Sequence, residues 1–141
     1  MRKIIIYTDG GARNNPGPAG AGVLIIDGKK KIELKKFLGD QTNNWAEYEA
    51  IALALAEAKK HKLEKCEIEV RADSLLVVEQ LSGNWKIKEP ALKTKHEKIN
   101  AMIIAHFPNI HFVHVPREEN TEADRLVNEA IDVALGQRLG L

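Results

Sequence analysis

The spacing of hydrophobic residues changes several times along this chain, and each change predicts a different element. Short apolar runs in the first third predict three strands, at residues 3–8, 22–26 and 32–37. The first run ends at Asp9, and residues 10–20 are so rich in glycine, proline and asparagine that a long loop is expected there. Asp27-Gly28 is a frequent hairpin turn, so the second and third strands should pair antiparallel.

Helical spacing begins at about Asn44. Apolar residues three and four positions apart predict four helices, at residues 44–60, 74–82, 90–108 and from about 121 to a stop near Gly136. Two alternating runs predict further strands, at residues 66–72 and 111–115. This order predicts an α/β fold: a five-stranded mixed sheet, three antiparallel strands followed by two parallel additions, flanked by helices.

Length and composition fit a single domain over residues 1–141. The chain has 44% hydrophobic and 29% charged residues, which excludes a disordered or collagen-like protein. It has no apolar run of the ~20 residues that a membrane span needs, and its first residues lack the apolar length of a secretory signal. We therefore expect a cytoplasmic protein without membrane contact. A single cysteine, Cys66, excludes an internal disulfide and a cysteine zinc site, and its alternation with Ile68 predicts burial.

Four acidic residues fall at the ends of predicted elements: Asp9, Glu47, Asp73 and Asp124. Each one also has a purely structural explanation, because turns and helix starts are common places for acidic residues. The spacings from Asn44 to Glu47 and from Thr121 to Asp124 fit capping boxes, and Asp73 precedes a serine suited to a helix cap. Taken singly, each residue fits the structural explanation better.

Taken together, the four residues fit a metal site better. If the strands that end at Asp9 and Asp73 are neighbours, the two carboxylates emerge side by side, and helices packed on the sheet can bring the other two to them. Two carboxylates ~4 Å apart repel by about 4 kcal/mol at an effective dielectric constant of ~20, whereas a helix cap contributes only ~1 kcal/mol. Divalent cations would neutralise this repulsion, and an all-carboxylate site favours Mg²⁺ or Mn²⁺. Without metal, at least one of the four should keep its proton to an unusually high pH.

The chain also carries five short blocks in a recognisable order: Tyr7-Thr8-Asp9-Gly10-Gly11, Asn15-Pro16-Gly17-Pro18-Ala19-Gly20, Thr42-Asn43-Asn44-x-x-Glu47, Ala72-Asp73-Ser74 and Asn120-x-x-x-Asp124. These blocks resemble the signature of type 1 ribonuclease H, over about residues 3–134. The resemblance implies the ribonuclease H-like fold. It also implies an endonuclease that hydrolyses the RNA strand of RNA/DNA hybrids and leaves 5′-phosphate and 3′-hydroxyl ends. We expect a monomer without an obligate protein partner.

By the same resemblance, two Mg²⁺ ions, with Mn²⁺ as an alternative, would bind the carboxylates. Asp9 would bridge both ions, Asp124 would complete the ion that activates water, and Glu47 and Asp73 would hold the ion at the leaving group. Some substrate contacts would come from residues near the first aspartate and the asparagine pair: Gly10, Gly11, Asn15, Thr42, Asn43 and Asn44. A basic segment of the protein would contact the DNA strand through Trp85, Lys86 and Lys88.

The sequence departs from the family pattern in its last loop and its basic segment. Many family members have a histidine in the loop before the last aspartate, where it assists the attacking water or the release of product. This loop is shorter and has no histidine, so Arg117 or Glu118 would take over that role. We expect His114 to pack on or line the sheet. The net charge is only +1, and residues 84–98 carry a local +3, so hybrid binding should be modest and sensitive to salt.

Two alternative functions remain open from the sequence. One is a module of the same fold that binds hybrids or structured RNA without cutting, which the missing histidine would suit. The other is a different nuclease of this fold, either an exonuclease or an enzyme for double-stranded RNA.

Overall fold

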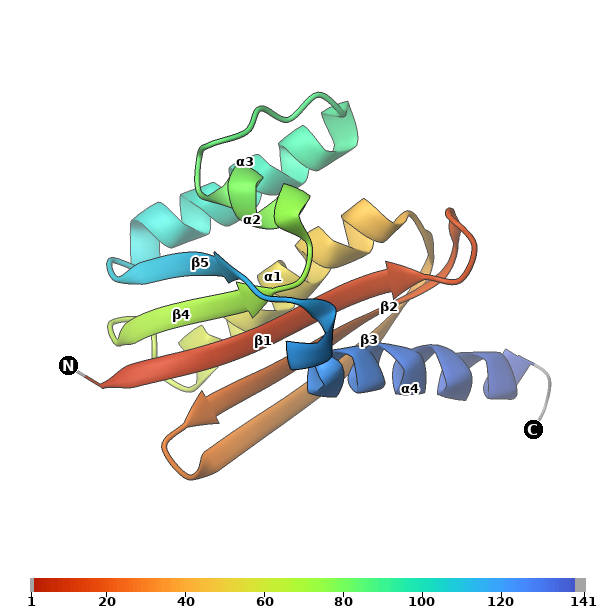
Figure 1. Ribbon diagram of the computed structural model, residues 1–141, viewed down its shortest axis with the longest axis horizontal. Helices are drawn as coiled ribbons and strands as arrows, with labels where there is room; N and C mark the ends of the chain where they lie inside the picture. Colours follow the sequence, from red (N-terminus) through yellow and green to blue (C-terminus); the bar gives the residue numbers. More distant parts are fainter. Residues whose placement is uncertain (1, 139–141) are drawn as a thin grey trace.

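Five strands form one mixed sheet in the order β3-β2-β1-β4-β5 (Figure 1). The computed structural model describes residues 2–138. The strands are β1 (Lys3–Ala12), β2 (Gly17–Asp27), β3 (Lys30–Gln41), β4 (Glu67–Ala72) and β5 (Ile110–His114). β2 pairs antiparallel with both β1 and β3, while β4 runs parallel to both β1 and β5. The predicted α/β sheet, with its antiparallel and parallel halves, is confirmed.

Helices cover both faces of this sheet. They are α1 (Asn43–Lys60), α2 (Leu75–Leu81), α3 (Pro90–His106) and α4 (Thr121–Arg138), with a 3₁₀ turn η1 (Arg117–Glu119) before α4. Figure 1 shows α4 crossing one face, where it packs on β2, β3 and β1, while α1 lies on the other face. α3 packs on the outside of α1. In the described part of the chain, none of the helices has the length and apolar character needed to cross a bilayer.

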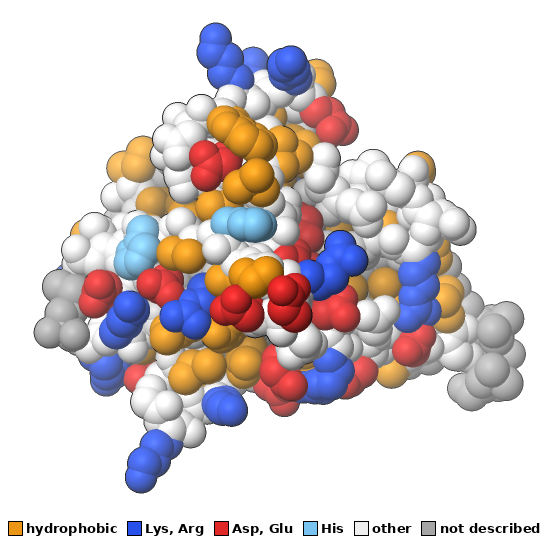
Figure 2. All heavy atoms as spheres, in the orientation of Figure 1, with side chains coloured by type: hydrophobic (Ala, Val, Ile, Leu, Met, Phe, Trp, Pro, Cys, Tyr) orange, Lys and Arg blue, Asp and Glu red, His pale blue; other side chains and the backbone are white. Residues whose placement is uncertain are grey.

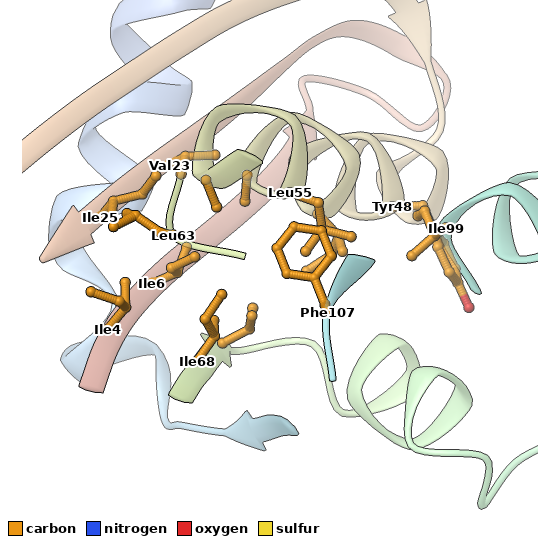
Figure 3. Packing of buried hydrophobic residues seen from close by; sticks show 14 of the residues in the cluster. Ile4, Ile6, Val23, Ile25, Tyr48, Leu55, Leu63, Ile68, Ile99 and Phe107 are labelled. Carbon is orange, nitrogen blue, oxygen red and sulfur yellow. The ribbon is translucent and has the colours of Figure 1, made fainter. Parts of the chain in front are cut away.

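The main hydrophobic core lies between α1 and the sheet (Figure 3). The strands contribute β-branched side chains that are fully buried: Ile4, Ile6, Val23, Ile25, Ile68 and Val70. α1 contributes the large side chains of Tyr48, Ile51 and Leu55, and between them the small Ala54 and Ala58 let the helix axis approach the sheet closely. At about 25 cal/mol for each Å² of apolar surface removed from water, this core is the main source of stability.

The glycine-rich loop predicted over residues 10–20 is largely wrong. β1 continues to Ala12 and β2 begins at Gly17, so the connection between them is short. Helices press on this part of the sheet from both sides. A Cβ at Gly10 would lie 2.2 Å from the carbonyl oxygen of Ala46 in α1, and one at Gly20 would lie 2.9 Å from that of Val127 in α4. Gly10 and Gly20 therefore belong to paired strands and permit close helix packing, instead of lying in the expected long loop.

Several local expectations also need correction. Thr42, and not Asn44, is the N-cap of α1, so Glu47 lies in the second turn and the proposed capping box does not exist. In α4 the N–H of Asp124 donates to the carbonyl oxygen of Asn120, which places Thr121 inside the helix and removes the second capping box. α4 also continues through Gly136.

Two side chains are more accessible than the alternating patterns predicted. His114 is exposed at the end of β5, an edge strand, instead of packing on the sheet. Cys66 precedes β4 and packs against the core cluster, but it is only partly buried.

Candidate active site

Three of the four predicted carboxylates converge beyond the paired region of β1 and β4. Thr8 in β1 pairs with Ala72, the last residue of β4, so the next residues, Asp9 and Asp73, are neighbours. Glu47 reaches the same point from the second turn of α1. Carboxylate oxygens of these three residues all lie within 4.8 Å of one another.

Burial makes this proximity electrostatically costly. Asp9 and Glu47 are only 7% and 8% exposed. Burial, followed by the charge of Asp73, raises the pKa of Asp9 from an ordinary 3.8 to about 7. Burial and the charges of Asp9 and Asp73 also raise the pKa of Glu47 well above its usual range, although a hydrogen bond from the backbone of Gly10 opposes this shift. The cluster therefore favours bound protons or bound cations.

Gly10 allows α1 to bring Glu47 to Asp9. A Cβ at Gly10 would lie 2.2 Å from the carbonyl oxygen of Ala46 and 2.5 Å from the amide nitrogen of Glu47. Real side chains do not tolerate such distances, so any other residue here would push the helix away from the strand. The same closeness permits the hydrogen bond between the Gly10 backbone and the Glu47 carboxylate.

Asp124 approaches the cluster from the first turn of α4. It is exposed and lines the same cleft, and its charge also contributes to the raised pKa of Asp9. Asn120 holds the start of this helix against β1, because its buried side chain donates from Nδ2 to the carbonyl oxygen of Thr8 over 2.9 Å. Asn120 belongs to the last of the five sequence blocks, but no spacing along the chain predicts this positioning contact.

A cleft of about 430 Å³ surrounds the carboxylates. Besides the four acidic residues, the cleft brings together five other predicted site residues: Gly10, Gly11, Asn43, Asn44 and Arg117. Arg117 lies in η1 and is exposed. An arginine at the rim of an acidic cluster can attract a phosphodiester that the carboxylates alone would repel.

The turn between β1 and β2 is tied to both helices that carry acidic residues. On the α1 side, Asn15 Oδ1 accepts the backbone N–H of Asn43, and Asn43 Oδ1 accepts the N–H of Ala12, at 2.9 and 2.8 Å. On the α4 side, Arg13 pairs with Asp132 at 2.7 Å. Arg13 also donates to Asn128 Oδ1 over 3.2 Å, and both residues line the cleft. Sequence reasoning missed these two residues because they lie 115 positions apart and neither belongs to a motif.

The other predicted substrate residues lie outside this cleft. Thr42 has a structural role, since its hydroxyl accepts the backbone N–H of Trp45 as the cap of α1. Trp85 and Lys86 line a second hollow of about 350 Å³ beside α2 and α3, and Lys88 lines neither hollow. Asn15 is exposed in the turn and contacts the cleft only through Asn43.

Charges on the face in Figure 2 are mixed. Lysine and arginine side chains lie among acidic ones and do not form one basic patch, as the net charge of +1 suggested. Within the basic segment, Lys95 is already paired with Glu49 and lies 4.1 Å from the ring centre of Trp45. The free positive charge of this segment is therefore smaller than its lysine count.

Comparison with known proteins identifies the family. The family model described as reverse transcriptase-like matches residues 7–130. The ribonuclease H of Clostridium botulinum strain Hall is 36% identical over 152 residues, an alignment that covers 94% of this chain and 97% of that protein. The chain belongs to the ribonuclease H family. Ribonuclease H enzymes generally depend on divalent metal ions, and the three clustered carboxylates supply the oxygen ligands that such ions prefer.

Two further ribonuclease H relatives show how far the similarity extends. The Mycobacterium tuberculosis protein named Bifunctional protein Rv2228c is 43% identical over 94% of this chain, but the chain spans only 36% of the length of that protein. The crystal structure of LC11-RNase H1 in complex with RNA/DNA hybrid matches with a TM-score of 0.90 and 53% identity, covering 94% of this chain and 99% of that one.

Proposed function

We propose that this protein is an endoribonuclease that hydrolyses the RNA strand of RNA/DNA hybrids and leaves 5′-phosphate and 3′-hydroxyl ends. The observation that carries the proposal is the convergence of Asp9, Glu47 and Asp73 within 4.8 Å, at the floor of an open cleft. A relative of 36% identity is named ribonuclease H, and a neighbour of 53% identity was crystallised with an RNA/DNA hybrid. The presence of the whole acidic set argues against a module that only binds.

We propose Mg²⁺ as the metal, with two ions bound in the presence of substrate and Mn²⁺ as a substitute. Asp9, Glu47 and Asp73 fit this role because they are oxygen donors, and because burial and then their mutual repulsion raise the pKa of Asp9 and of Glu47. Asp124, at the exposed side of the cleft, would complete the ligand set. Bound divalent ions supply an activated water and charge neutralisation at the leaving 3′-oxygen.

The chain's own residues would bind and orient the hybrid. Asn43 uses Oδ1 to accept the Ala12 N–H, which leaves its Nδ2 to donate to an RNA 2′-hydroxyl in the minor groove. Gly10, Gly11 and Asn44 line the same cleft, so they lie where an RNA strand must pass to reach the carboxylates. Asn15 and Thr42, next to this site, would contact a phosphate of the DNA strand.

Arg117 would take part in the chemistry as a cation at the rim of the cleft. Its guanidinium can hold a phosphate oxygen while the RNA strand is cut, or help to release the product. Trp85, Lys86 and Lys88 would contact the DNA strand through stacking and phosphate neutralisation. We place this activity in a single domain that acts as a monomer in the cytoplasm, a reducing compartment that suits the free Cys66.

Cleavage of an end-labelled RNA/DNA hybrid tests the proposal. We expect internal cuts in the RNA strand only, in Mg²⁺ and not in EDTA. Uniform double-stranded RNA, double-stranded DNA and chimeric duplexes serve as matched substrates. Binding of the hybrid without cutting would favour a non-catalytic module, and products that shorten from one end would favour an exonuclease.

A further inference from the structure

A buried glutamine connects the core to the segment that carries Trp85 and Lys86. Gln80, near the end of α2, is only 5% exposed. Its Oε1 accepts a hydrogen bond from the hydroxyl of Tyr48 over 2.5 Å, and its Nε2 donates to the backbone carbonyl oxygen of Lys86 over 3.3 Å. A primary amide is suited to this position because it can accept on one side and donate on the other.

The first half of the segment after α2 is held by the helix end. Gly83 donates its N–H to the carbonyl oxygen of Gln80, and Asn84 and Trp85 donate theirs to that of Glu79. Beyond Trp85 the segment depends on Gln80, whose Nε2 bond fixes the Lys86 backbone. Ile87 then packs against the core, and α3 begins at Pro90.

The other end of the glutamine is equally fixed. Tyr48 lies in α1 directly after Glu47, is fully buried, and packs edge-on against the ring of His96 in α3. His96 Nε2 lies 3.1 Å from the backbone oxygen of Gln80, so both the side chain and the backbone of Gln80 are anchored. The position of Lys86 is therefore set by a rigid, buried polar network that spans three helices.

The outer side of this network faces solvent. Gln80, His96, Trp85 and Lys86 line the second hollow, and Trp85 is 46% exposed there. An exposed indole beside a lysine suits a nucleic-acid strand, because the ring can stack and the ammonium can neutralise a phosphate. Holding such groups in place before binding lowers the entropy cost of ordering them on the substrate.

We propose that Gln80 is a positioning residue for substrate binding, whose carboxamide, oriented by the Tyr48 hydroxyl, holds Lys86 beside Trp85, where it contacts the DNA strand of the hybrid. The inference rests on the proposed function, since it assumes that an RNA/DNA hybrid is the substrate. Gln80 does not touch the reacting atoms in this assignment, so its loss should weaken binding and leave the chemical step unchanged.

Four variants separate the positioning of Lys86 from a general loss of protein stability. Gln80→Leu removes the bond to Lys86 but leaves the buried Tyr48 hydroxyl without its partner, which also destabilises the fold. The double variant Tyr48→Phe/Gln80→Leu removes both polar groups, so it should recover stability while the Lys86 carbonyl remains untethered. The single variant Tyr48→Phe keeps the bond to Lys86. Ile25→Val, a buried change in β2, is the control for loss of stability alone.

The measurements are the hybrid dissociation constant in EDTA, its salt dependence, and KM and kcat in Mg²⁺. We expect Gln80→Leu and the double variant to raise Kd and KM about tenfold, with kcat within about twofold of wild type. The slope of log Kd against log salt concentration should fall by about one, because one phosphate contact, that of Lys86, is lost. Ile25→Val should bind within about twofold of wild type, whereas Tyr48→Phe, which removes the hydroxyl that orients the carboxamide, should weaken binding, but less than Gln80→Leu does.

A double-mutant cycle with Lys86→Ala completes the test. If Gln80 acts through Lys86, adding Gln80→Leu to Lys86→Ala should cost little further affinity. The inference is overturned if Gln80→Leu binds like wild type, if it lowers kcat instead of affinity, or if the two losses of affinity simply add. It is also overturned if Lys86→Ala binds normally. A wild-type protein that neither binds nor cuts the hybrid would overturn the proposed function itself.

Discussion

Gly10 in β1 and Ala46 in α1 are in such close contact that a Cβ on the glycine would lie 2.2 Å from the alanine carbonyl oxygen. This contact determines how near Glu47, the next residue in α1, comes to Asp9, the residue before the glycine. The acidic cluster therefore depends on a packing contact between two residues that carry no functional side chain. Stability and metal binding should respond together when that contact is changed.

Gly10→Ala should both destabilise the protein and weaken metal binding. The methyl group must displace the α1 backbone, and overpacking of this kind costs about 1–3 kcal/mol. The shift moves Glu47 away from Asp9 and Asp73, so hybrid cleavage should fall at least about tenfold. Thermal denaturation and Mg²⁺ titration measure the two effects.

Gly11→Ala is the matched control for the stability effect of that substitution. A Cβ there meets only Asn43 Oδ1 at 3.9 Å, an ordinary contact, so its melting temperature should stay close to that of wild type. Equal melting temperatures for the two alanine variants would show that the close packing of Gly10 is unimportant.

The metal-free protein should lose stability as the pH rises from about 4 to about 7. In this range Asp9 keeps its proton in the folded state, where its pKa is raised from 3.8 to about 7, but has lost it in the unfolded chain. The stabilisation that the Asp9 proton provides is complete below the pKa of Asp9 in the unfolded chain. It disappears as the pH rises through the pKa of Asp9 in the folded protein. One pKa unit corresponds to about 1.4 kcal/mol, so the expected loss is about 2–4 kcal/mol.

Denaturation in EDTA at pH 5.5 and pH 8, for wild type and Asp9→Asn, measures this effect. The variant should be more stable than wild type at pH 8 and should show a weaker dependence on pH. Adding Mg²⁺ or Mn²⁺ should raise the stability of wild type at pH 8 and have little effect on the variant. The electrostatic explanation fails if Asp9→Asn is destabilised equally at both pH values.

Asn120→Ala should disturb the start of α4. It removes the 2.9 Å bond from Nδ2 to the carbonyl oxygen of Thr8 and leaves a buried acceptor without that donor, which costs about 1–3 kcal/mol. Because Asp124 follows one turn later, the metal dependence of cleavage should shift to higher Mg²⁺ concentration. Asn84→Ala is the control, because its side chain bonds Glu79 at an exposed site. A Mg²⁺ dependence identical to that of wild type would remove Asn120 from the positioning of Asp124.

Arg117→Ala should lower kcat about tenfold or more, because the rim of the cleft loses a cation that can hold a phosphate oxygen. The fold should be unaffected, since Arg117 is exposed in a short 3₁₀ turn. Arg2→Ala, which removes an arginine paired with Asp27 far from the cleft, is the matched control. An unchanged kcat for Arg117→Ala would show that Arg117 has no part in the reaction, and Glu118 of the same loop would be the next residue to test.

Much of the fold could be predicted because hydrophobic spacing reflects burial. The bounds of α1, α2 and β4 are within one or two residues of those expected. The error at residues 10–20 has a physical cause. Glycine signals a turn in a sequence, yet Gly10 and Gly20 are glycines because helices press on the strands there. A sequence does not distinguish the two reasons, since the pressing residues are far away in the chain.

The site was predictable only where topology decides it. Parallel pairing of β1 and β4 brings Asp9 and Asp73 together, so their proximity followed from the order of the strands. Contacts such as Arg13 with Asn128, or Gln80 with Tyr48, depend on side chains from separate elements meeting in space. No periodicity or spacing in the chain carries that information.

Cleavage of a labelled RNA/DNA hybrid by wild type, Asp9→Asn and Asp73→Asn tests the central claim most directly. Each substitution removes one negative charge from the cluster and keeps the side-chain size, so thermal denaturation should show that both variants fold. We expect wild type to cut only the RNA strand in Mg²⁺, and both variants to lose at least about a thousandfold in kcat, as expected when a metal ligand is removed. Near-normal cleavage by either folded variant would contradict the metal-dependent mechanism at these carboxylates.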